Sequence, residues 1–319
     1  MAEDASMTAD RVTLGDQTLQ VRPLGIGTWA WGDRRTWGYG REYGDAELEE
    51  AFQAAVEAGV ELFDTAEIYG SGRSETLLGE FMRRHGGGQV IVATKFFPYP
   101  WRLRRSALVK ALQGSLKRLG LPRVDLYQIH WPFPPVPIET WVDALGEAVE
   151  LGLARAAGVS NYSRDQMLRA YEVLSRRQLT LASNQVEYSL LHRAPEENGV
   201  LDACRQTGAV LIAYGPLAKG LLTGKYGPDN PPRGFLRRTN RSLLEAIQPL
   251  VSLLRELGEK YGGKSPAQVA LNWVIGKGAI PIPGAKNARQ ARENAGALGW
   301  RLEDDDVARL DEASARVGR

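Results

Sequence analysis

Short apolar segments alternate with longer amphipathic segments along most of the chain. Eight short segments, most of them rich in apolar residues, resemble parallel strands that are buried on both faces. They lie at residues 24–26, 62–63, 90–93, 126–129, 156–159, 183–186, 210–213 and 280–282. Helical spacing of apolar positions follows several of them, at residues 45–58, 74–84, 106–119, 139–151 and 164–176. Eight such alternations predict an α/β fold and favour a (β/α)8 TIM barrel.

A doubly wound open sheet has the same local pattern, so periodicity alone leaves it as an alternative. Two β-prone runs around Gly15-Asp16 predict an N-terminal β-hairpin. Residues 265–275 and 303–317 predict extra C-terminal helices, and residues 215–240 form a long loop rich in glycine and proline. We expect residues 1–10 to be a disordered N-terminus and residues 11–319 to form a single barrel domain.

The charge balance restricts the range of partners. With 40 basic and 38 acidic residues the net charge is only +2, so we expect no nucleic-acid or membrane partner. Cys204 is the single cysteine, and the three histidines are scattered without metal-ligand spacing, which predicts a reducing compartment and no metal site. No apolar stretch approaches the roughly 20 residues of a membrane span. We therefore expect a cytoplasmic protein.

Polar side chains end most of the apolar runs. In a (β/α)8 barrel the active site lies at the carboxyl ends of the strands, so these are the candidate catalytic and binding residues. Each one has an ordinary structural explanation as a cap, a rim ion pair or a core histidine. An acid, a base, a phenol and an imidazole at one end of a barrel are harder to explain in this way. The candidates are Asp64, Tyr69, Lys95, His130, Ser160, Asn161, Gln185 and Tyr214.

The short sequence motifs around these residues are similar to those of the aldo-keto reductases, and they occur in the same order from about Val12 to Val317. The resemblance favours a bacterial and plant-type branch of that family. It rests on Gly25-Ile-Gly-Thr-Trp, Phe63-Asp-Thr-Ala-Glu-Ile-Tyr-Gly, Ala93-Thr-Lys, Asp125-Leu-Tyr-Gln-Ile-His-Trp-Pro, Gly158-Val-Ser-Asn, Ala182-Ser-Asn-Gln-Val-Glu-Tyr-Ser-Leu, Arg193-Ala-Pro-Glu and Pro281-Ile-Pro-Gly-Ala-Lys-Asn.

The resemblance implies a catalytic tetrad of Asp64, Tyr69, Lys95 and His130. Tyr69 would donate the proton. The unperturbed pKa of a phenol is about 10, and we expect the ammonium of Lys95 to lower the pKa of Tyr69 by stabilising the phenolate. Asp64 would hold Lys95 in place and offset the cost of burying it. His130 would hydrogen-bond the substrate oxygen and polarise the carbonyl.

A nicotinamide cofactor is also implied, because no side chain delivers hydride. The Rossmann fingerprint is absent after the first strand, so the resemblance implies barrel-type binding of NADPH/NADP+. Tyr214 would stack on the nicotinamide, and Lys286 would bind the 2′-phosphate, with the roles of Arg289 and Arg292 left open. The expected cofactor contacts are Gly27, Thr28, Trp29, Asp64, Ser160, Asn161, Gln185, Tyr214, Gly215, Pro216, Leu217, Gly220, Leu222, Gly224, Gly284, Ala285, Lys286, Gln290, Glu293 and Asn294.

Aromatic residues just beyond the strand ends suggest an apolar or aromatic carbonyl substrate. The expected pocket residues are Trp29, Trp31, Phe96 and Trp131, with Trp37 nearby in the sequence. Several of these side chains could equally cover the barrel rim.

The resemblance implies an NADP-dependent alcohol oxidoreductase that reduces aldehydes and ketones to alcohols. We expect a small-molecule carbonyl substrate and a monomer or weak homo-oligomer. An NADPH-binding redox-sensing or channel-associated regulatory subunit with slow turnover is the alternative, because some members serve in that way and a complete tetrad does not separate the two. A (β/α)8 lyase or hydrolase is disfavoured, since the sequence lacks metal ligands and a Schiff-base context.

Overall fold

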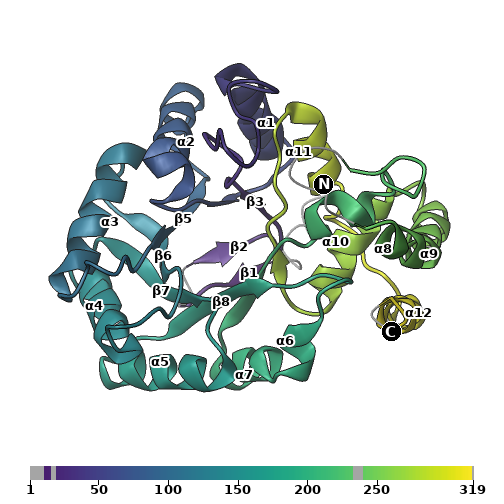
Figure 1. Ribbon diagram of the computed structural model, residues 1–319. Helices are drawn as coiled ribbons and strands as arrows, with labels where there is room; N and C mark the ends of the chain where they lie inside the picture. Colours follow the sequence, from purple (N-terminus) through teal and green to yellow (C-terminus); the bar gives the residue numbers. More distant parts are fainter. Residues whose placement is uncertain (1–10, 16–18, 233–239, 318–319) are drawn as a thin grey trace, which may run out of the picture.

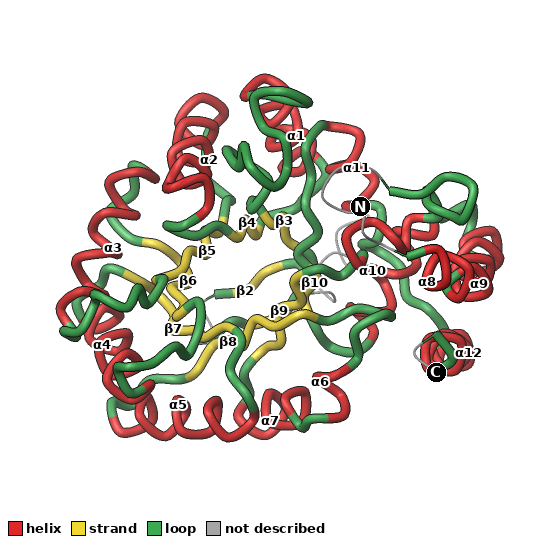
Figure 2. The backbone as a smooth tube through the Cα atoms, viewed as in Figure 1, coloured by secondary structure: helices red, strands yellow, loops and turns green. Residues whose placement is uncertain are grey.

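The computed structural model describes residues 11–15, 19–232 and 240–317. Its centre is an eight-stranded sheet in which all neighbouring strands pair in parallel and follow one another in chain order. Figure 2 shows the strands arranged around a central axis with helices outside them. The strands are β3 (Gly25–Gly27), β4 (Leu62–Asp64), β5 (Ile91–Phe96), β6 (Val124–Ile129), β7 (Ala154–Ser160), β8 (Leu181–Glu187), β9 (Val210–Tyr214) and β10 (Ile280–Pro281).

The first and last strands meet at a seam that closes the barrel. Gly27 and Gly284 form a parallel bridge, and the Gly27 amide donates to the Pro283 carbonyl at 3.0 Å. A Cβ on Gly27 would lie 2.8 Å from the Ile282 carbonyl oxygen, so the close approach requires glycine at this position. The predicted (β/α)8 barrel is confirmed, and the open doubly wound sheet is excluded.

Helices surround the barrel, and each strand except the last is followed by at least one helix before the next strand (Figure 1). The predicted bounds of five early helices agree with the structure to within one or two residues. The helices are α1 (Asp45–Glu57), η1 (Tyr69–Gly72), α2 (Arg73–His85), α3 (Ser106–Leu119), α4 (Ile138–Glu150), α5 (Arg164–Arg176), α6 (Ala194–Glu197), α7 (Val200–Thr207), η2 (Ala218–Thr223), α8 (Arg241–Ala246), α9 (Gln248–Lys260), α10 (Pro266–Gly276), α11 (Ala288–Ala295) and α12 (Asp304–Ala315).

The predicted hairpin consists of β1 (Val12–Thr13) and β2 (Gln20–Val21), which pair antiparallel. Its apolar residues Leu14, Leu19 and Val21 have at most 2% of their surface exposed and pack in one cluster with inward-facing residues of the barrel strands. Figure 1 shows the hairpin across the barrel axis. One end of the barrel is therefore filled by apolar side chains, and the polar strand ends are left for a site at the other end.

The chain between β9 and α10 differs most from the prediction. The sequence pattern indicated a loop over residues 215–240 and then one extra helix, but η2, α8 and α9 also lie in this interval. The Asn240 side chain caps α8 by accepting from the Leu243 amide, and α9 buries four apolar residues at helical spacing: Leu250, Val251, Leu254 and Leu257. The predicted disorder of residues 1–10 lies outside the described residues.

Candidate active site

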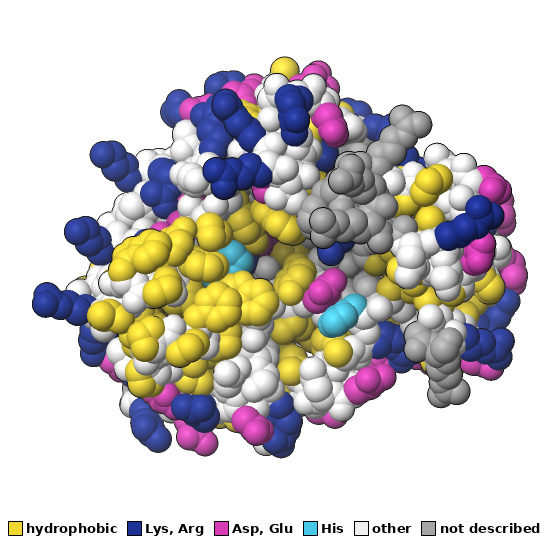
Figure 3. All heavy atoms as spheres, in the orientation of Figure 1, with side chains coloured by type: hydrophobic (Ala, Val, Ile, Leu, Met, Phe, Trp, Pro, Cys, Tyr) yellow, Lys and Arg dark blue, Asp and Glu magenta, His cyan; other side chains and the backbone are white. Residues whose placement is uncertain are grey.

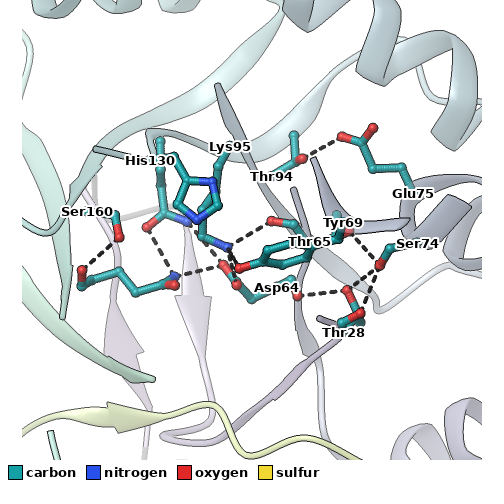
Figure 4. A network of polar contacts seen from close by, with 12 residues as sticks. Thr28, Asp64, Thr65, Tyr69, Ser74, Glu75, Thr94, Lys95, His130 and Ser160 are labelled. Atoms are coloured by element: carbon teal, nitrogen blue, oxygen red, sulfur yellow. Dashed lines mark hydrogen bonds and ion pairs between the residues drawn. The ribbon is translucent and has the colours of Figure 1, made fainter. Parts of the chain in front are cut away.

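The barrel brings the four predicted catalytic residues together at the carboxyl ends of three adjacent strands (Figure 4). Asp64 ends β4, Lys95 lies near the end of β5, and His130 directly follows β6, while Tyr69 begins η1 after β4. Lys95 is fully buried, and its Nζ donates to Asp64 Oδ1, to the Thr65 carbonyl at 2.9 Å and to Tyr69 Oη at 3.4 Å. All three ammonium protons therefore have an oxygen acceptor.

The charge of Lys95 is maintained by its neighbours. Burial favours the neutral amine, but the oxygens of Asp64 and Tyr69 together outweigh this effect, so the pKa of Lys95 is raised above its ordinary value. Breaking such a buried pair leaves an uncompensated charge and typically costs about 3–5 kcal/mol. Asp64 and Lys95 are thus interdependent, as the sequence predicted.

The pKa of Tyr69 corrects one expectation. Burial of the phenol raises its pKa above the ordinary value, and although Lys95 acts to lower it, burial is the larger effect. Lys95 therefore limits the rise and does not produce the predicted net decrease. In this state Tyr69 keeps its proton at neutral pH, as a proton donor must.

His130, the fourth predicted catalytic residue, lies against the ring of Tyr69. The two rings are 5.6 Å apart between centroids and nearly perpendicular. Burial, followed by the positive charge of Lys95, holds the pKa of His130 well below its ordinary value, so the imidazole is neutral. A neutral imidazole donates one N–H bond without competing with Tyr69 as an acid.

A cluster of hydroxyl groups lies below the tetrad and holds the loop that carries Tyr69 (Figure 4). The Ser74 hydroxyl, in the first turn of α2, lies 2.7 Å from the Thr28 hydroxyl, accepts from Thr65 at 2.9 Å and reaches the Thr28 carbonyl at 3.0 Å. Thr28 also donates to the Asp64 carbonyl at 2.9 Å. These bonds fix both ends of the segment that leads to Tyr69.

Three of the residues expected at the nicotinamide lie beside the tetrad and bond to one another. Asn161 has a positive φ of 61°, and its amide donates to the His130 carbonyl at 3.0 Å and to Ser160 Oγ at 3.1 Å. The Tyr214 hydroxyl donates to Asn161 Oδ1 at 3.0 Å. Burial and then the charge of Glu187 raise the pKa of Tyr214 to about 12, so this phenol remains neutral. The arrangement presents an aromatic ring and amide groups next to His130.

The segment after β9 contains several residues with a left-handed backbone. Gly215, Ala218, Lys219, Gly220 and Gly224 all have positive φ values, although two of them carry side chains. Three of them, Ala218 to Gly220, are consecutive, and the amides of Ala218, Gly220 and Leu222 donate to carbonyls within the segment. The contact of this segment with a pyrophosphate stays a prediction.

Lys286 follows β10, and its side chain lies against two aromatic rings that belong to the loop between β3 and α1. Its Nζ is 4.9 Å from the centroid of Trp37 and 4.7 Å from that of Tyr43, and it donates to the Trp37 carbonyl at 3.1 Å. Burial lowers the pKa of Lys286, the charges of Glu42 and Asp33 oppose the decrease, and Lys225 adds a smaller decrease. No carboxylate forms an ion pair with it within the described ranges. Lys286 is therefore a half-buried cation available for an anionic partner.

The neighbouring polar residues of α11 have internal partners. Gln290 accepts from the Lys286 amide at 2.8 Å, and Asn294 donates to the Gly284 carbonyl at 3.2 Å, so both hold the turn that carries Lys286. Glu293 pairs with the exposed Arg289 at 3.4 Å. Arg292 points to Glu57 of α1 at 3.9 Å. Of the three basic residues considered at the 2′-phosphate, Lys286 has the most suitable surroundings.

Aromatic rings extend from the tetrad to the molecular surface. Phe97 lies 5.6 Å from His130 and 6.0 Å from Phe133, which stacks on Trp131 at 5.3 Å. A second row runs from Phe97 to Tyr99 and the exposed Trp101. Figure 3 shows hydrophobic side chains gathered on this face on the side of α3 and α4.

On another side of the tetrad, Trp29 is 43% exposed and lies 6.4 Å from the Tyr69 ring and 5.5 Å from Trp37. Together with the Phe97 row, it places apolar rings on two sides of the predicted catalytic residues.

Comparison with known proteins identifies the family. The model of the Aldo/keto reductase family matches residues 23–315. The chloroplastic pyridoxal reductase of Arabidopsis thaliana is 42% identical over 308 residues, which cover 93% of this chain and 84% of the relative. The chain belongs to the aldo/keto reductase family. This membership makes it an NAD(P)-dependent oxidoreductase.

Two further relatives of this aldo/keto reductase differ in their described roles. A probable voltage-gated potassium channel subunit beta from Oryza sativa subsp. japonica is 33% identical over 302 residues, covering 89% of this chain and 90% of the relative. The solved structure of an aldo-keto reductase from Klebsiella pneumoniae in complex with NADPH has a TM-score of 0.74 and 27% identity, over 95% of this chain and 94% of that one.

Five residues that were expected to contact a ligand have no exposed surface in this structure, and their contact with a ligand stays a prediction. The Trp31 indole donates to the Ala285 carbonyl and packs on Phe63 and Phe81. Phe96 follows the inward-facing Lys95, so it faces outward and packs on Trp141. The five are Thr28, Trp31, Phe96, Leu222 and Ala285.

Sequence reasoning also missed residues of this aldo/keto reductase that lie at the site. Phe97 and Phe133 line the mouth where Phe96 was expected, and the alternation of side chains along β5 could have identified the first of them. Gln128 interrupts an apolar strand run and reaches Asp64. A buried amide among apolar residues is itself a signal of a polar partner.

Two observations bear on the remaining expectations. In the described part of the chain, no helix combines the length and the apolar character needed to cross a membrane. Within the same residues, no three His, Cys, Asp or Glu side chains gather as metal ligands. The name of the Arabidopsis relative refers to the chloroplast, so a cytoplasmic location for this aldo/keto reductase stays a prediction.

Proposed function

We propose that this aldo/keto reductase reduces an aldehyde or ketone to an alcohol with NADPH, and that Tyr69 gives its proton to the carbonyl oxygen. The observation that carries the proposal is the contact of one buried ammonium, Lys95 Nζ, with Asp64, the Thr65 carbonyl and Tyr69 Oη, beside a neutral His130. A protonated phenol and a neutral imidazole next to a fixed cation suit proton donation to a developing alkoxide.

The residues around the tetrad fit a nicotinamide cofactor. Asn161, Ser160 and Tyr214 provide amide, hydroxyl and ring surfaces, and we expect the pyrophosphate to lie along residues 215–224, which directly follow β9. The cofactor supplies a hydride to the carbonyl carbon when it is bound. Gln185 would take part through its amide, which in this structure donates to Asp64 Oδ2 at 2.8 Å.

The chain's own groups perform the other half of the reaction. His130 and Tyr69 orient the carbonyl oxygen from two sides, and the Tyr69 proton moves to that oxygen as it gains charge. Lys95 then stabilises the phenolate that remains, which is a charge stabilisation realised only as the reaction proceeds. The aromatic rings of Phe97 and Trp29 exclude water from this region, so these electrostatic interactions are little screened.

Lys286 is our proposal for the 2′-phosphate contact that makes NADPH the preferred cofactor. A cation already held by Trp37 and Tyr43, without a carboxylate in ion-pair contact, has little to lose when an anion approaches. Lys225 is close enough to lower the pKa of Lys286 and would add a second positive charge to the same anion site.

Lys286→Ala should weaken NADPH binding roughly ten- to a hundred-fold, because a charged hydrogen bond is worth about 1.5–3 kcal/mol. NADH binding should change little, since NADH has no 2′-phosphate. Titration of both cofactors against tryptophan fluorescence measures the two affinities, and Trp37 lies next to the substituted side chain. Arg289→Ala, at an exposed position paired with Glu293, is the matched control. Equal weakening of NADPH and NADH would contradict the assignment.

An aromatic aldehyde or ketone is the substrate class that suits the mouth best. Phe97 lies against His130, and its loop is held by Glu67, which accepts from the Phe97 amide at 2.7 Å and from Arg102 at 2.9 Å. A ring fixed in this way next to the reacting group favours a flat aromatic partner by about 0.5–1.5 kcal/mol beyond its buried area. Pyridoxal, named for the Arabidopsis relative, is an aldehyde of this kind.

A panel of aldehydes assayed by NADPH oxidation tests both the activity and the substrate class. Aromatic aldehydes, pyridoxal included, should have lower KM values than short aliphatic ones. Phe97→Ala should lower kcat/KM for the aromatic aldehydes by roughly ten-fold and leave the aliphatic ones nearly unchanged. Trp101→Ala, 73% exposed at the far end of the aromatic row, should affect neither group. An equal loss on both groups of aldehydes would point to a general defect.

The same assay separates the enzyme from a regulatory NADPH-binding subunit. The rice relative with a channel-subunit name is the reason to keep this second function. Tight NADPH binding with negligible oxidation across the whole panel would favour it. Steady turnover that depends on Tyr69 would favour the reductase.

A further inference from the structure

A second carboxamide, in addition to Gln185, contacts the tetrad from inside the barrel. Gln128 lies on β6 in register with Lys95 of β5 on one side and Gly158 of β7 on the other. Its side chain is fully buried, and its Nε2 donates to Asp64 Oδ2 at 3.1 Å. Its Oε1 accepts from Gln185 Nε2 at 3.4 Å. Gln128 therefore connects the catalytic carboxylate to a residue expected at the nicotinamide.

The neighbouring strand is shaped to accommodate this side chain. A Cβ on Gly158 would lie 3.0 Å from Gln128 Cγ and 2.5 Å from Ser183 Oγ. A methyl group there would push Gln128 away from Asp64, whereas glycine leaves room for the long amide to lie against β7. The glycine of the Gly158-Val-Ser-Asn motif thus has a steric role next to the tetrad, in addition to the role that the motif is expected to have at the cofactor.

The two oxygens of Asp64 have different partners. Oδ1 faces Lys95, while Oδ2 accepts from the amides of Gln128 and Gln185. If the Oδ2 bonds were lost, the carboxylate could rotate, and the direction in which it holds the ammonium would no longer be fixed. A buried amide costs free energy unless it is hydrogen-bonded, so an apolar residue would pack here more favourably if these bonds had no use.

We propose that Gln128 is a positioning residue, which orients the Asp64 carboxylate toward Lys95 and ties that orientation to Gln185. It touches neither substrate nor the transferred proton and acts only through these two side chains. The effect on turnover rests on the proposed reductase function. The structural coupling of Gln128 to Asp64 does not, and it has a readout of its own.

Gln128→Glu tests the contact through pH, because the new carboxyl has nearly the same shape as the amide. While protonated, it can donate to Asp64 Oδ2 as the amide does, and kcat should stay close to that of the wild type. Once ionised, it faces Asp64 across the same contact, with Lys95, Tyr69 and His130 as the other ionisable groups nearby. We expect kcat of this variant to fall as pH rises through neutrality, in a step that the wild type lacks.

Gln128→Leu removes both amide bonds and adds no charge. It should lower kcat roughly ten- to a hundred-fold at every pH, with a much smaller change in KM for the aldehyde. Ser183→Ala is the control for packing in the same layer of the barrel, because Ser183 is buried and its hydroxyl has no hydrogen-bond partner in the described residues. A wild-type kcat for Gln128→Leu would overturn the proposal, as would a loss in Gln128→Glu that does not change with pH.

Unfolding midpoints provide the readout that does not depend on turnover. The new carboxyl in Gln128→Glu should have a raised pKa in the folded state because it is buried beside Asp64, so its protonated form is the compatible one. The folded protein then loses stability relative to the wild type as pH rises above about 4.3, the ordinary value for Glu. If the wild type shows no turnover, the reductase proposal fails while this shift still tests the contact. A midpoint difference that is constant between pH 4 and 8 would contradict it.

Discussion

Tyr69→Phe is expected to reduce turnover by at least roughly 10²- to 10⁴-fold, the usual range for general acid catalysis, while NADPH binding persists. The substitution keeps the ring that contacts Trp29 and His130 and removes only the hydroxyl. Lys95 loses the weakest of its three contacts, at 3.4 Å, and keeps Asp64 and the Thr65 carbonyl. The fold and the charge of Lys95 should therefore survive, so a loss of rate reports on the proton donor.

Tyr127→Phe is the matched control for this prediction. Tyr127 is fully buried and near the site in sequence, but it faces α3, where its hydroxyl donates to the Leu108 carbonyl at 3.5 Å. It should keep nearly all of its activity. NADPH oxidation with an aromatic aldehyde measures both variants, and fluorescence titration measures cofactor affinity. Turnover within about two-fold of the wild type in Tyr69→Phe would make the catalytic assignment wrong, since the expected loss is far larger.

The barrel could be predicted because parallel strands buried on both faces leave a strong mark in the sequence. The run at 210–213 is apolar over its whole length, the run at 126–129 is apolar except for Gln128, and the helices between the strands keep a separate spacing. Helix α9 has a comparable helical spacing of apolar residues, at Leu250, Leu254 and Leu257, but the sequence analysis assigned no element to residues 241–264, where α8 and α9 lie.

The grouping of the strand-end candidates could also be predicted, because the carboxyl ends of neighbouring strands meet at one end of a barrel, whereas the choice of four of them as a tetrad came from the resemblance to the aldo-keto reductases. Asp64, Lys95 and His130 end consecutive strands, so closing the sheet brings them together without any knowledge of side-chain packing. The sequence analysis did not predict in which direction the side chains next to these strand ends point. Phe96 and Phe97 are the same residue type, but side chains alternate along β5. Phe96 is therefore buried between the strand and the helices, while Phe97 lies beside His130.

Contacts across the barrel were the least accessible to sequence analysis. Gln128 and Gln185 reach Asp64 over sequence separations of 64 and 121 residues, and neither contact follows from a local pattern. The net direction of the Tyr69 pKa shift likewise does not follow from a local sequence pattern. The presence of Lys95 beside it was predictable, but the extent of burial, which outweighs the charge, depends on the packing of loops from several strands.

Lys95→Met is expected to be nearly as harmful to turnover as the loss of Tyr69, for two separable reasons. Tyr69 loses Lys95, the one cation of the described residues that lowers its pKa, so this pKa should rise further. In addition, Asp64 becomes a buried carboxylate without its ion-pair partner, which should reduce the free energy of unfolding by about 3–5 kcal/mol. The first effect concerns chemistry and the second concerns stability, and a single activity measurement would combine them.

A double variant, Asp64→Asn with Lys95→Met, separates the two effects. It removes both buried charges, so most of the lost stability should return in denaturant unfolding, while turnover stays low because Tyr69 still lacks its cation. The pH profile of alcohol oxidation tests the chemistry directly, because that direction requires ionised Tyr69. Removing a neighbouring positive charge disfavours the phenolate, so the rise in rate with pH should move to higher pH in Lys95→Met and in the double variant. A profile that coincides with that of the wild type in both variants would show that Lys95 does not act on Tyr69, and recovery of turnover in the double variant would assign the loss to folding alone.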